Sequence, residues 1–225
     1  MEEIVVTADR RNSFSQDYLQ AGAFRDARII DTPLTVSVMS RELLDAQQAL
    51  SIMDAVRNTA GVTQSQLNAT IYSNLSIRGV AVDNVTNYRF NGVLPIINFI
   101  DMPIENKDRV EVLKGAAGLY YGFASPSGIV NLVTSRASAE PINKASLSGN
   151  VHGAYGGHVD IGRKWGDVGL RVNAAANSLE TGVDDTKGRR YFGTAAFDWD
   201  VTDDLEVMLD RSEEHTSELQ SHHDL

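Results

Sequence analysis

The strongest constraint on the fold is a period-two alternation of apolar and polar residues that begins near residue 143. In "ASLSGNVHGAY", Leu147, Val151 and Tyr155 are apolar and alternate with polar residues. The alternation returns in "VGLRVNAAAN", "YFGTAAFDWDV" and "LEVML". Because successive side chains of a strand point to opposite faces, these segments are predicted to be antiparallel strands with one apolar and one polar face.

The connections between these strands alternate in length. Gly166-Asp167 and Thr202-Asp203-Asp204 are tight, whereas "ETGVDDTKGR" is long. Short turns on one side and longer loops on the other are typical of transmembrane β-barrels, and Trp165 and Trp199 lie near the tight turns, as an interfacial aromatic girdle requires. A soluble antiparallel sheet with one buried face gives the same alternation, so both structures stay open here.

Residues 32–136 have the pattern of a small α+β domain. "TVSVM" alternates as a strand, Ser40 precedes the helix formers of "RELLDAQQAL", and Ser51 with Asp54 has capping-box spacing. Gly61 suits a position just past a helix end. Short strands are predicted in "NLSIRGV", "RVEVL" and "GIVNLVT". Before this domain, the β-prone "EIVVTA" leads into a polar arm.

Composition excludes several function classes. The net charge is −10 with no basic block, which argues against nucleic-acid binding, and cysteine is absent, so neither a thiolate metal site nor a cysteine nucleophile is expected. The sequence contains no run of about 18 apolar residues, so no transmembrane helix is predicted. The start Met1-Glu2-Glu3 is not an export signal, so an exported protein would need a leader that this sequence lacks.

Five segments together resemble the N-terminal plug of a TonB-dependent outer-membrane receptor. They are "EIVVTA", "DTPLTVSVMSRELL", "DAVRNTAGV", "LSIRGV" and "RVEVLKGAAGLYYGFASPSGIVNLVT", in this order. The last is the most specific; Ala116 stands where a proline is common and Ser127 where a glycine is common. The resemblance implies an arm and linker at residues 1–31, a plug at 32–140 and the first strands of an antiparallel transmembrane β-barrel at 141–210.

In this family the plug folds inside a barrel of about 22 strands. The resemblance implies active import across the bacterial outer membrane, energised by the partner protein TonB, by a monomer embedded in lipid. "DTPLTVSVMSRELL" is similar to the version in ferric-siderophore receptors, so a ferric siderophore is the first expectation. A vitamin, haem or glycan is the alternative. Iron would arrive already chelated, so neither a cofactor nor a resident metal is expected.

The resemblance also implies roles for three groups of residues. The TonB box, which would add a strand to the partner's sheet, comprises Ile4, Val5, Val6, Thr7 and Ala8. The candidate siderophore contacts are Arg78, Tyr88, Arg89, Asn98 and Phe99. The candidate plug–barrel ion pairs involve Arg109, Glu111 and Lys114, with Arg78 beside them. Each group has a structural alternative: an edge strand, loop packing, or solvated strand charges.

The loop within residues 109–136 carries four glycines, Gly115, Gly118, Gly122 and Gly128. Glycines permit tight turns, and Tyr120, Tyr121 and Phe123 are expected to pack against them, so this loop is interpreted as scaffold. Lys114-Gly115 lacks the residues of a phosphate-binding loop. No pair of carboxylates has a spacing that specifies hydrolysis, so the protein is not expected to be an enzyme.

The segment "RSEEHTSELQSHHDL", residues 211–225, departs from the alternation. It resembles the translation of a sequencing-library adapter and is interpreted as artefactual. The barrel would then be truncated, with open sheet edges, and we expect the 225-residue chain alone to be inactive in transport. A soluble plug-like binding or signalling module remains the alternative from another class.

Overall fold

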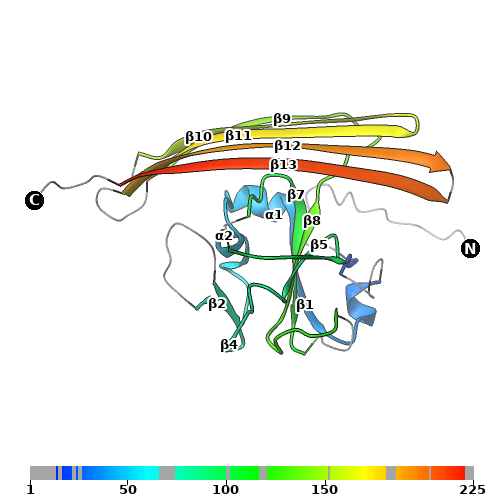
Figure 1. Cartoon of the computed structure of the whole chain (residues 1–225), viewed down its shortest axis with the longest axis vertical. Helices are drawn as coiled ribbons and strands as arrows, with labels where there is room; N and C mark the ends of the chain where they lie inside the picture. Colours follow the sequence, from blue (N-terminus) through cyan, green and yellow to red (C-terminus); the bar gives the residue numbers. More distant parts are fainter. Residues whose placement is uncertain are drawn as a thin grey trace, which may run out of the picture.

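The computed structural model describes residues 14, 17–21, 24, 27–65, 74–99, 102–116, 121–151, 153–180, 186–202 and 204–220. They form an α+β domain and a layer of five long strands that lies across one side of it (Figure 1). The predicted order, an α+β domain followed by antiparallel strands, is confirmed. No helix among these residues is long and apolar enough to cross a membrane.

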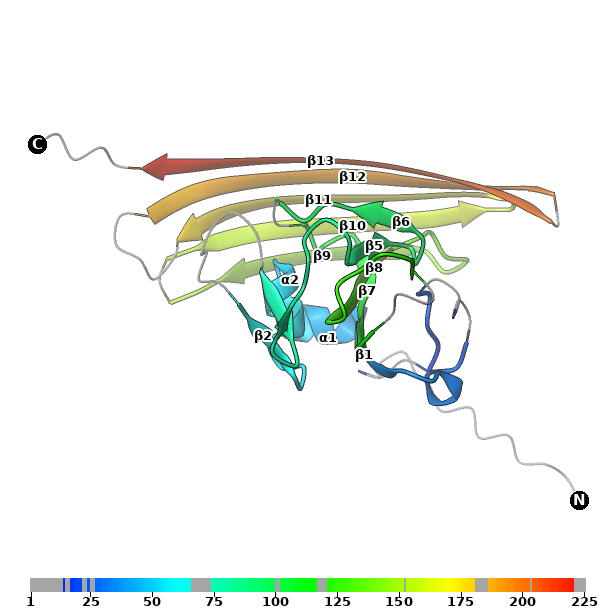
Figure 2. The ribbon, with the colours of Figure 1, turned by 60° about the horizontal axis from the view of Figure 1, so that its bottom comes forward.

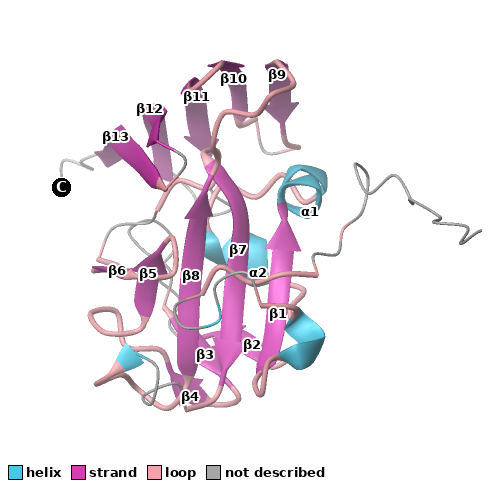
Figure 3. Ribbon diagram, turned by 90° about the vertical axis from the view of Figure 1, so that its right-hand side faces the viewer, coloured by secondary structure: helices cyan, strands magenta, loops and turns pink. Residues whose placement is uncertain are grey.

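The α+β domain is built on a five-stranded sheet in the order β1-β7-β8-β5-β6 (Figure 3). Its strands are β1 (Thr35–Ser40), β5 (Tyr88–Phe90), β6 (Leu94–Ile96), β7 (Lys107–Lys114) and β8 (Gly128–Thr134). All neighbours are antiparallel except β5 and β8, which are parallel. A second, smaller sheet contains β2 (Val62–Gln64), β3 (Leu75–Ile77) and β4 (Val80–Ala81).

The helical segments described in full are η3 (Ile29–Asp31), α1 (Arg41–Ala46) and α2 (Ile52–Val56). Ser40 caps α1 by accepting from the Leu43 amide, and Ser51 and Asp54 form the predicted capping box of α2. Gly61 is not the residue after the helix, because α2 ends five residues earlier; its positive φ of 73° serves the turn before β2.

The core lies between these helices and the two sheets. Its members are apolar side chains with little or no exposure, which is what holds short elements of this kind together. They include Leu44, Ile52, Val56, Leu75, Ile77, Tyr88, Ile104, Val110, Val112, Val130 and Leu132.

The second layer is an up-and-down antiparallel sheet in chain order (Figure 2). Its strands are β9 (Ile142–Gly149), β10 (Tyr155–Trp165), β11 (Val168–Glu180), β12 (Thr186–Thr202) and β13 (Leu205–Gln220). The last four have 11, 13, 17 and 16 residues, and a strand needs about 9–11 to cross a bilayer.

The two faces of this sheet differ as the alternation predicts. Polar residues face the α+β domain and are buried: Asp160, Arg171, Asn173, Asn177, Arg190, Thr194 and Asp198. Large apolar residues on the other face remain exposed: Tyr155, Ile161, Trp165, Leu170, Val172, Tyr191 and Trp199. The inner face is therefore polar because it meets the domain, and the outer face is apolar without a protein partner among the described residues.

Strand β13 continues past residue 210, where the sequence pattern changes. Backbone pairing with β12 runs from Leu205 opposite Thr202 to Gln220 opposite Thr186. Main-chain ladder bonds make few demands on side chains, so a polar segment is able to extend the strand. The interpretation of residues 211–225 as artefactual stays a prediction.

Candidate functional site

The α+β domain and the sheet meet through paired charges, which we call the domain–sheet interface. Glu105, just before β7, forms a two-pronged ion pair with Arg190 of β12, in which Nη2 donates to Oε2 at 3.1 Å. Both side chains are more than nine-tenths buried. Arg190 also pairs with Glu214 of β13 and lies over the Phe192 ring. A bidentate pair of this kind is strong and orientation-specific.

A second contact of the interface centres on Arg136, in the linker between β8 and β9. Its Nη1 donates to Asp198 of β12 at 2.9 Å, and its Nη2 pairs with Asp210 of β13. Its carbonyl accepts from Arg171 of β11, and Arg171 is itself paired with Asp160 of β10. Arg136, in the segment that links the domain to the sheet, thus contacts β11, β12 and β13 directly and is connected to β10 through Arg171.

Sequence reasoning did not identify Glu105, Arg136 or Arg190 as interface residues. The available signal was the inward position of charged residues on the predicted strands, since a charge on a polar, enclosed face requires a partner. Asn106 adds a weaker contact, in which its Nδ2 donates to Thr194 Oγ1 at 3.4 Å.

The charges expected to join plug and barrel form contacts within the α+β domain, and their pairing with barrel carboxylates stays a prediction. Arg109 Nε donates to Glu111 at 2.9 Å and its Nη1 pairs with Asp108. Lys114 Nζ donates to the Ala60 carbonyl at 2.7 Å. None of these contacts reaches the described strands β9–β13. Burial alone would lower the pKa of Arg109, but Glu111 and Asp108 outweigh it and the pKa is raised.

Glu111 is the centre of a buried network in the domain. Its carboxylate is fully buried and accepts from Arg109, from Asn131 Nδ2 of β8 at 2.8 Å and from the Gln20 amide at 2.9 Å. Gln20 belongs to the segment that precedes β1. This one side chain therefore ties β7, β8 and the N-terminal segment together.

Lys107, the first residue of β7, is a buried cation close to the domain–sheet interface. It is 1% exposed, its Nζ donates to Asn106 Oδ1, and it lies 5.0 Å from the centre of the Phe90 ring. Burial lowers its pKa to about 7, against the opposing effect of Glu105, Asp210 and Glu214. A change in the charge of Lys107 near neutral pH would alter its electrostatic interactions with the carboxylates of the interface, Glu105, Asp210 and Glu214.

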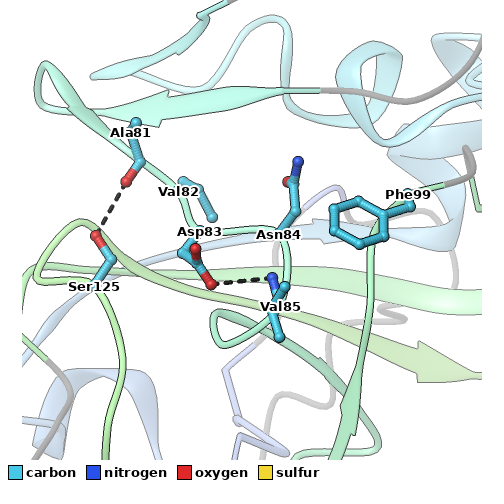
Figure 4. A pocket seen from close by; sticks show the side chains of 7 residues that line it. All are labelled: Ala81, Val82, Asp83, Asn84, Val85, Phe99 and Ser125. Atoms are coloured by element: carbon cyan, nitrogen blue, oxygen red, sulfur yellow. Dashed lines mark hydrogen bonds between the residues drawn. The ribbon is translucent and has the colours of Figure 1, made fainter.

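An open pocket with a volume of about 480 Å³ lies on the surface of the α+β domain, lined by Ala81, Val82, Asp83, Asn84, Val85, Phe99 and Ser125 (Figure 4). We call it the loop pocket. Its walls are tied together by hydrogen bonds. Ser125 Oγ donates to the Ala81 carbonyl at 3.0 Å, and the buried Asn87 side chain exchanges hydrogen bonds of 2.9 Å with the main chain of Ser125.

Of the five residues expected to contact a siderophore, Phe99 alone lines the loop pocket. Tyr88, Arg89 and Asn98 are buried. In this structure their side chains pack beneath the loops and are not exposed to a ligand. Arg89 Nη1 donates to the Thr86 and Tyr88 carbonyls, and burial lowers its pKa. Arg78 donates from Nη2 to Thr35 Oγ1 at 2.9 Å, at the start of β1. The sequence did not indicate residues 81–85 as a pocket wall.

The glycine-rich loop behaves largely as the expected scaffold. Gly128 has φ of 138°, and a Cβ there would lie 2.1 Å from the Leu113 carbonyl oxygen. Tyr121 is partly buried, with Arg89 5.4 Å from its ring centre. Phe123 was expected to pack against the turns, but it is 91% exposed, so this expectation is wrong. Gly118 and Tyr120 lie outside the described residues.

The candidate TonB box, residues 4–8, also lies outside the described residues. Within the part of the chain that the structure describes, no group of three or more His, Asp or Glu side chains is placed to hold a metal ion. Among the described residues, the features considered for function are the domain–sheet interface and the loop pocket.

Residues 28–129 match the family model described as TonB-dependent Receptor Plug Domain. Among curated proteins, the ferrichrome receptor FcuA of Yersinia enterocolitica is 30% identical over 183 residues, which cover 78% of this chain and 24% of that protein. The ferric-pyoverdine M114 receptor PbuA of Pseudomonas sp. strain M114 is 31% identical over 198 residues, 80% of this chain and 22% of that protein.

Among solved structures, BauA, the ferric preacinetobactin receptor from Acinetobacter baumannii, matches with a TM-score of 0.80 and 26% identity. The match covers 88% of this chain and 30% of that one. The chain thus spans about a quarter of the curated relatives it matches.

Proposed function

We propose that the whole protein imports a ferric siderophore across the bacterial outer membrane, on the premise that residues 28–129 match the plug domain of TonB-dependent receptors. The relatives named above are receptors for ferrichrome, pyoverdine and preacinetobactin, which supports the substrate class. The relatives named above are receptors or transport proteins by their names, and no feature of the described residues calls for an enzymatic step.

The observation that carries the proposal is the two-faced sheet pressed against the plug. Its polar face is paired with plug residues, while tyrosines, tryptophans and aliphatic side chains cover the other face. A barrel wall in a membrane needs this arrangement, because lipid contacts its outside and the lumen holds polar groups. A soluble plug-like module would expose this apolar face to water, which is unfavourable over so large a patch.

Energy for import would enter through the N-terminal segment. We infer that residues 4–8 bind TonB by adding a strand to its sheet, where main-chain hydrogen bonds supply the affinity. The segment that precedes β1 joins the plug at the Gln20–Glu111 hydrogen bond. A pull on this segment would load the main-chain hydrogen bonds of Asp17 and Leu19 to residues 27–29 and then the buried network around Glu111.

The test is an uptake assay with the complete gene, obtained by resequencing across codon 210, in an outer-membrane receptor-deficient strain. Growth under iron restriction is measured with ferrichrome, ferrioxamine B and ferric enterobactin, each with and without TonB. We expect TonB-dependent growth on at least one chelate. Growth on none of them, with TonB-dependent uptake of cobalamin, haem or an oligosaccharide, would assign the protein to another nutrient.

A further inference from the structure

The loop pocket has a charge that bears on which chelate it accepts. We propose that it forms the plug's part of the siderophore site and selects ferric chelates without net negative charge, as in the tris-hydroxamate class, over polyanionic tris-catecholates. This proposal rests on the proposed import function. A volume of about 480 Å³ falls within the range of about 300–1,000 Å³ typical of small-molecule sites.

Asp83 is the ionisable residue of the pocket lining, and the local backbone holds it in its charged form. Its Oδ1 accepts from the Val85 amide at 3.0 Å and from the amide and hydroxyl of Thr86, both at 2.8 Å. These hydrogen bonds, that of the Thr86 hydroxyl first, lower the pKa of Asp83. The pocket therefore carries a fixed negative charge at neutral pH.

No cation of the surrounding loops balances this charge in the pocket. Between residues 61 and 106 the sequence has two basic residues, Arg78 and Arg89, and between 115 and 128 it has none. Arg78 is hydrogen-bonded to Thr35 at the start of β1. Arg89 is buried against Tyr121 and two carbonyls. Neither arginine belongs to the pocket lining.

The remaining lining groups suit a neutral ligand. Val85 and Phe99 expose apolar surface at the rim, at 46% and 54%. The Asn84 amide is fixed by its hydrogen bond to Asn74 Oδ1 at 2.7 Å, and Ser125 Oγ is engaged with Ala81. The pocket thus offers apolar contact and oriented amide dipoles, together with one carboxylate.

The chelate classes differ in the charge that such a pocket would meet. Three hydroxamates each lose one proton on binding Fe³⁺ and give a neutral complex. Three catecholates each lose two protons and leave three negative charges. Coulomb repulsion between those charges and Asp83 is modest in water but grows where the ligand displaces solvent, and it weakens with salt.

The test measures binding of ferrichrome and ferric enterobactin to the purified full-length receptor at low and high ionic strength. At low salt we expect ferrichrome to bind at least about tenfold more tightly than ferric enterobactin. This gap in affinity between the two chelates should narrow as salt screens Asp83. Asp83→Asn keeps the acceptor for the Val85 and Thr86 amides but removes the charge, so it should narrow the gap about threefold or more. Asp31→Asn, an exposed acid outside the pocket lining, is the matched control and should leave the gap unchanged.

Three outcomes would overturn the proposal. Tighter binding of ferric enterobactin in the wild-type protein would show that the site prefers an anionic chelate, and import of that chelate would leave the import function intact. An equal effect of Asp83→Asn and Asp31→Asn would show that the loop pocket does not meet the ligand. Failure to import any ferric chelate would remove the import function, and this inference with it.

Discussion

Removing Arg190 should loosen the plug from the sheet, because the Glu105 carboxylate would then stay buried without its partner. Glu105 and Arg190 are 5% and 8% exposed as side chains and share a two-pronged contact. Breaking one side of such a buried pair costs about 3–5 kcal/mol. We therefore expect Arg190→Met to lower the free energy of plug opening by about 3 kcal/mol, a change in opening equilibrium of roughly a hundredfold.

The assay uses a single reporter thiol. This chain has no cysteine, and Ser135, 3% exposed beside Arg136, has no hydrogen-bond partner for its hydroxyl among the described residues. Ser135→Cys is therefore a mild change that becomes reactive only when the interface opens. In the full-length receptor, the labelling rate in urea should rise about a hundredfold on adding Arg190→Met.

Two further variants decide whether the ion pair is responsible. Glu105→Gln combined with Arg190→Met removes both charges of this pair and should recover most of the loss, since the one carboxylate then left without Arg190, that of Glu214, is less deeply buried than Glu105. Lys164→Met breaks the half-exposed pair with Asp200 and should change opening by less than about 1 kcal/mol. The reasoning would be refuted if the single variants Glu105→Gln and Arg190→Met had additive effects on plug opening, with no recovery in the double variant.

Three other predictions concern the plug and the N-terminal arm. Gly128→Ala should destabilise the plug by about 3 kcal/mol in a urea titration, because the alanine would be strained at positive φ and would clash. Its Cβ would lie 2.1 Å from the Leu113 carbonyl oxygen. The control Gly122→Ala has φ of 73° and open space around it, so it should cost only about 1 kcal/mol in the same titration. Burial lowers the pKa of Lys107 to about 7, so between that pH and about 10.4 the unfolded chain binds a proton that the folded plug does not. Plug stability should then rise with pH through this window, and a urea midpoint that rises equally in Lys107→Met would contradict the assignment. Finally, Val5→Pro removes a ladder donor and should abolish TonB capture in a pull-down that Val5→Ala survives; retained capture by the proline variant would exclude strand addition at this residue.

The repeating parts of the fold could be predicted from sequence because they follow from local rules. The alternation in β11 and β12 predicted which face of these two strands is polar, and Ser51 with Asp54 predicted the start of α2. The helix predicted after Ser40 is shorter than its run of helix formers, since α1 ends at Ala46. Its end is set by packing and by the turn at Gln47 and Gln48, which propensity alone does not specify.

The partners of the charged residues could not be predicted in the same way. Arg109 and Glu111 were recognised as residues that need partners, yet they are neighbours on one face of β7 and pair with each other. The charges that do join the plug to the sheet, Glu105 and Arg190, are 85 residues apart. Such a contact depends on how two layers lie against each other.

The sequence by itself determined that an α+β domain precedes antiparallel strands, which faces of β11 and β12 are polar, and that residues 28–129 match a plug domain, since these depend on residue type and spacing along the chain. Tertiary structure alone decided that Tyr88, Arg89 and Asn98 are buried, that Asp83 and Phe99 share a pocket, and that Arg136 connects the plug to the strands. Burial and charge pairing are properties of segments brought together from distant parts of the chain. A local pattern can indicate that a charge needs a partner, but only packing selects the partner.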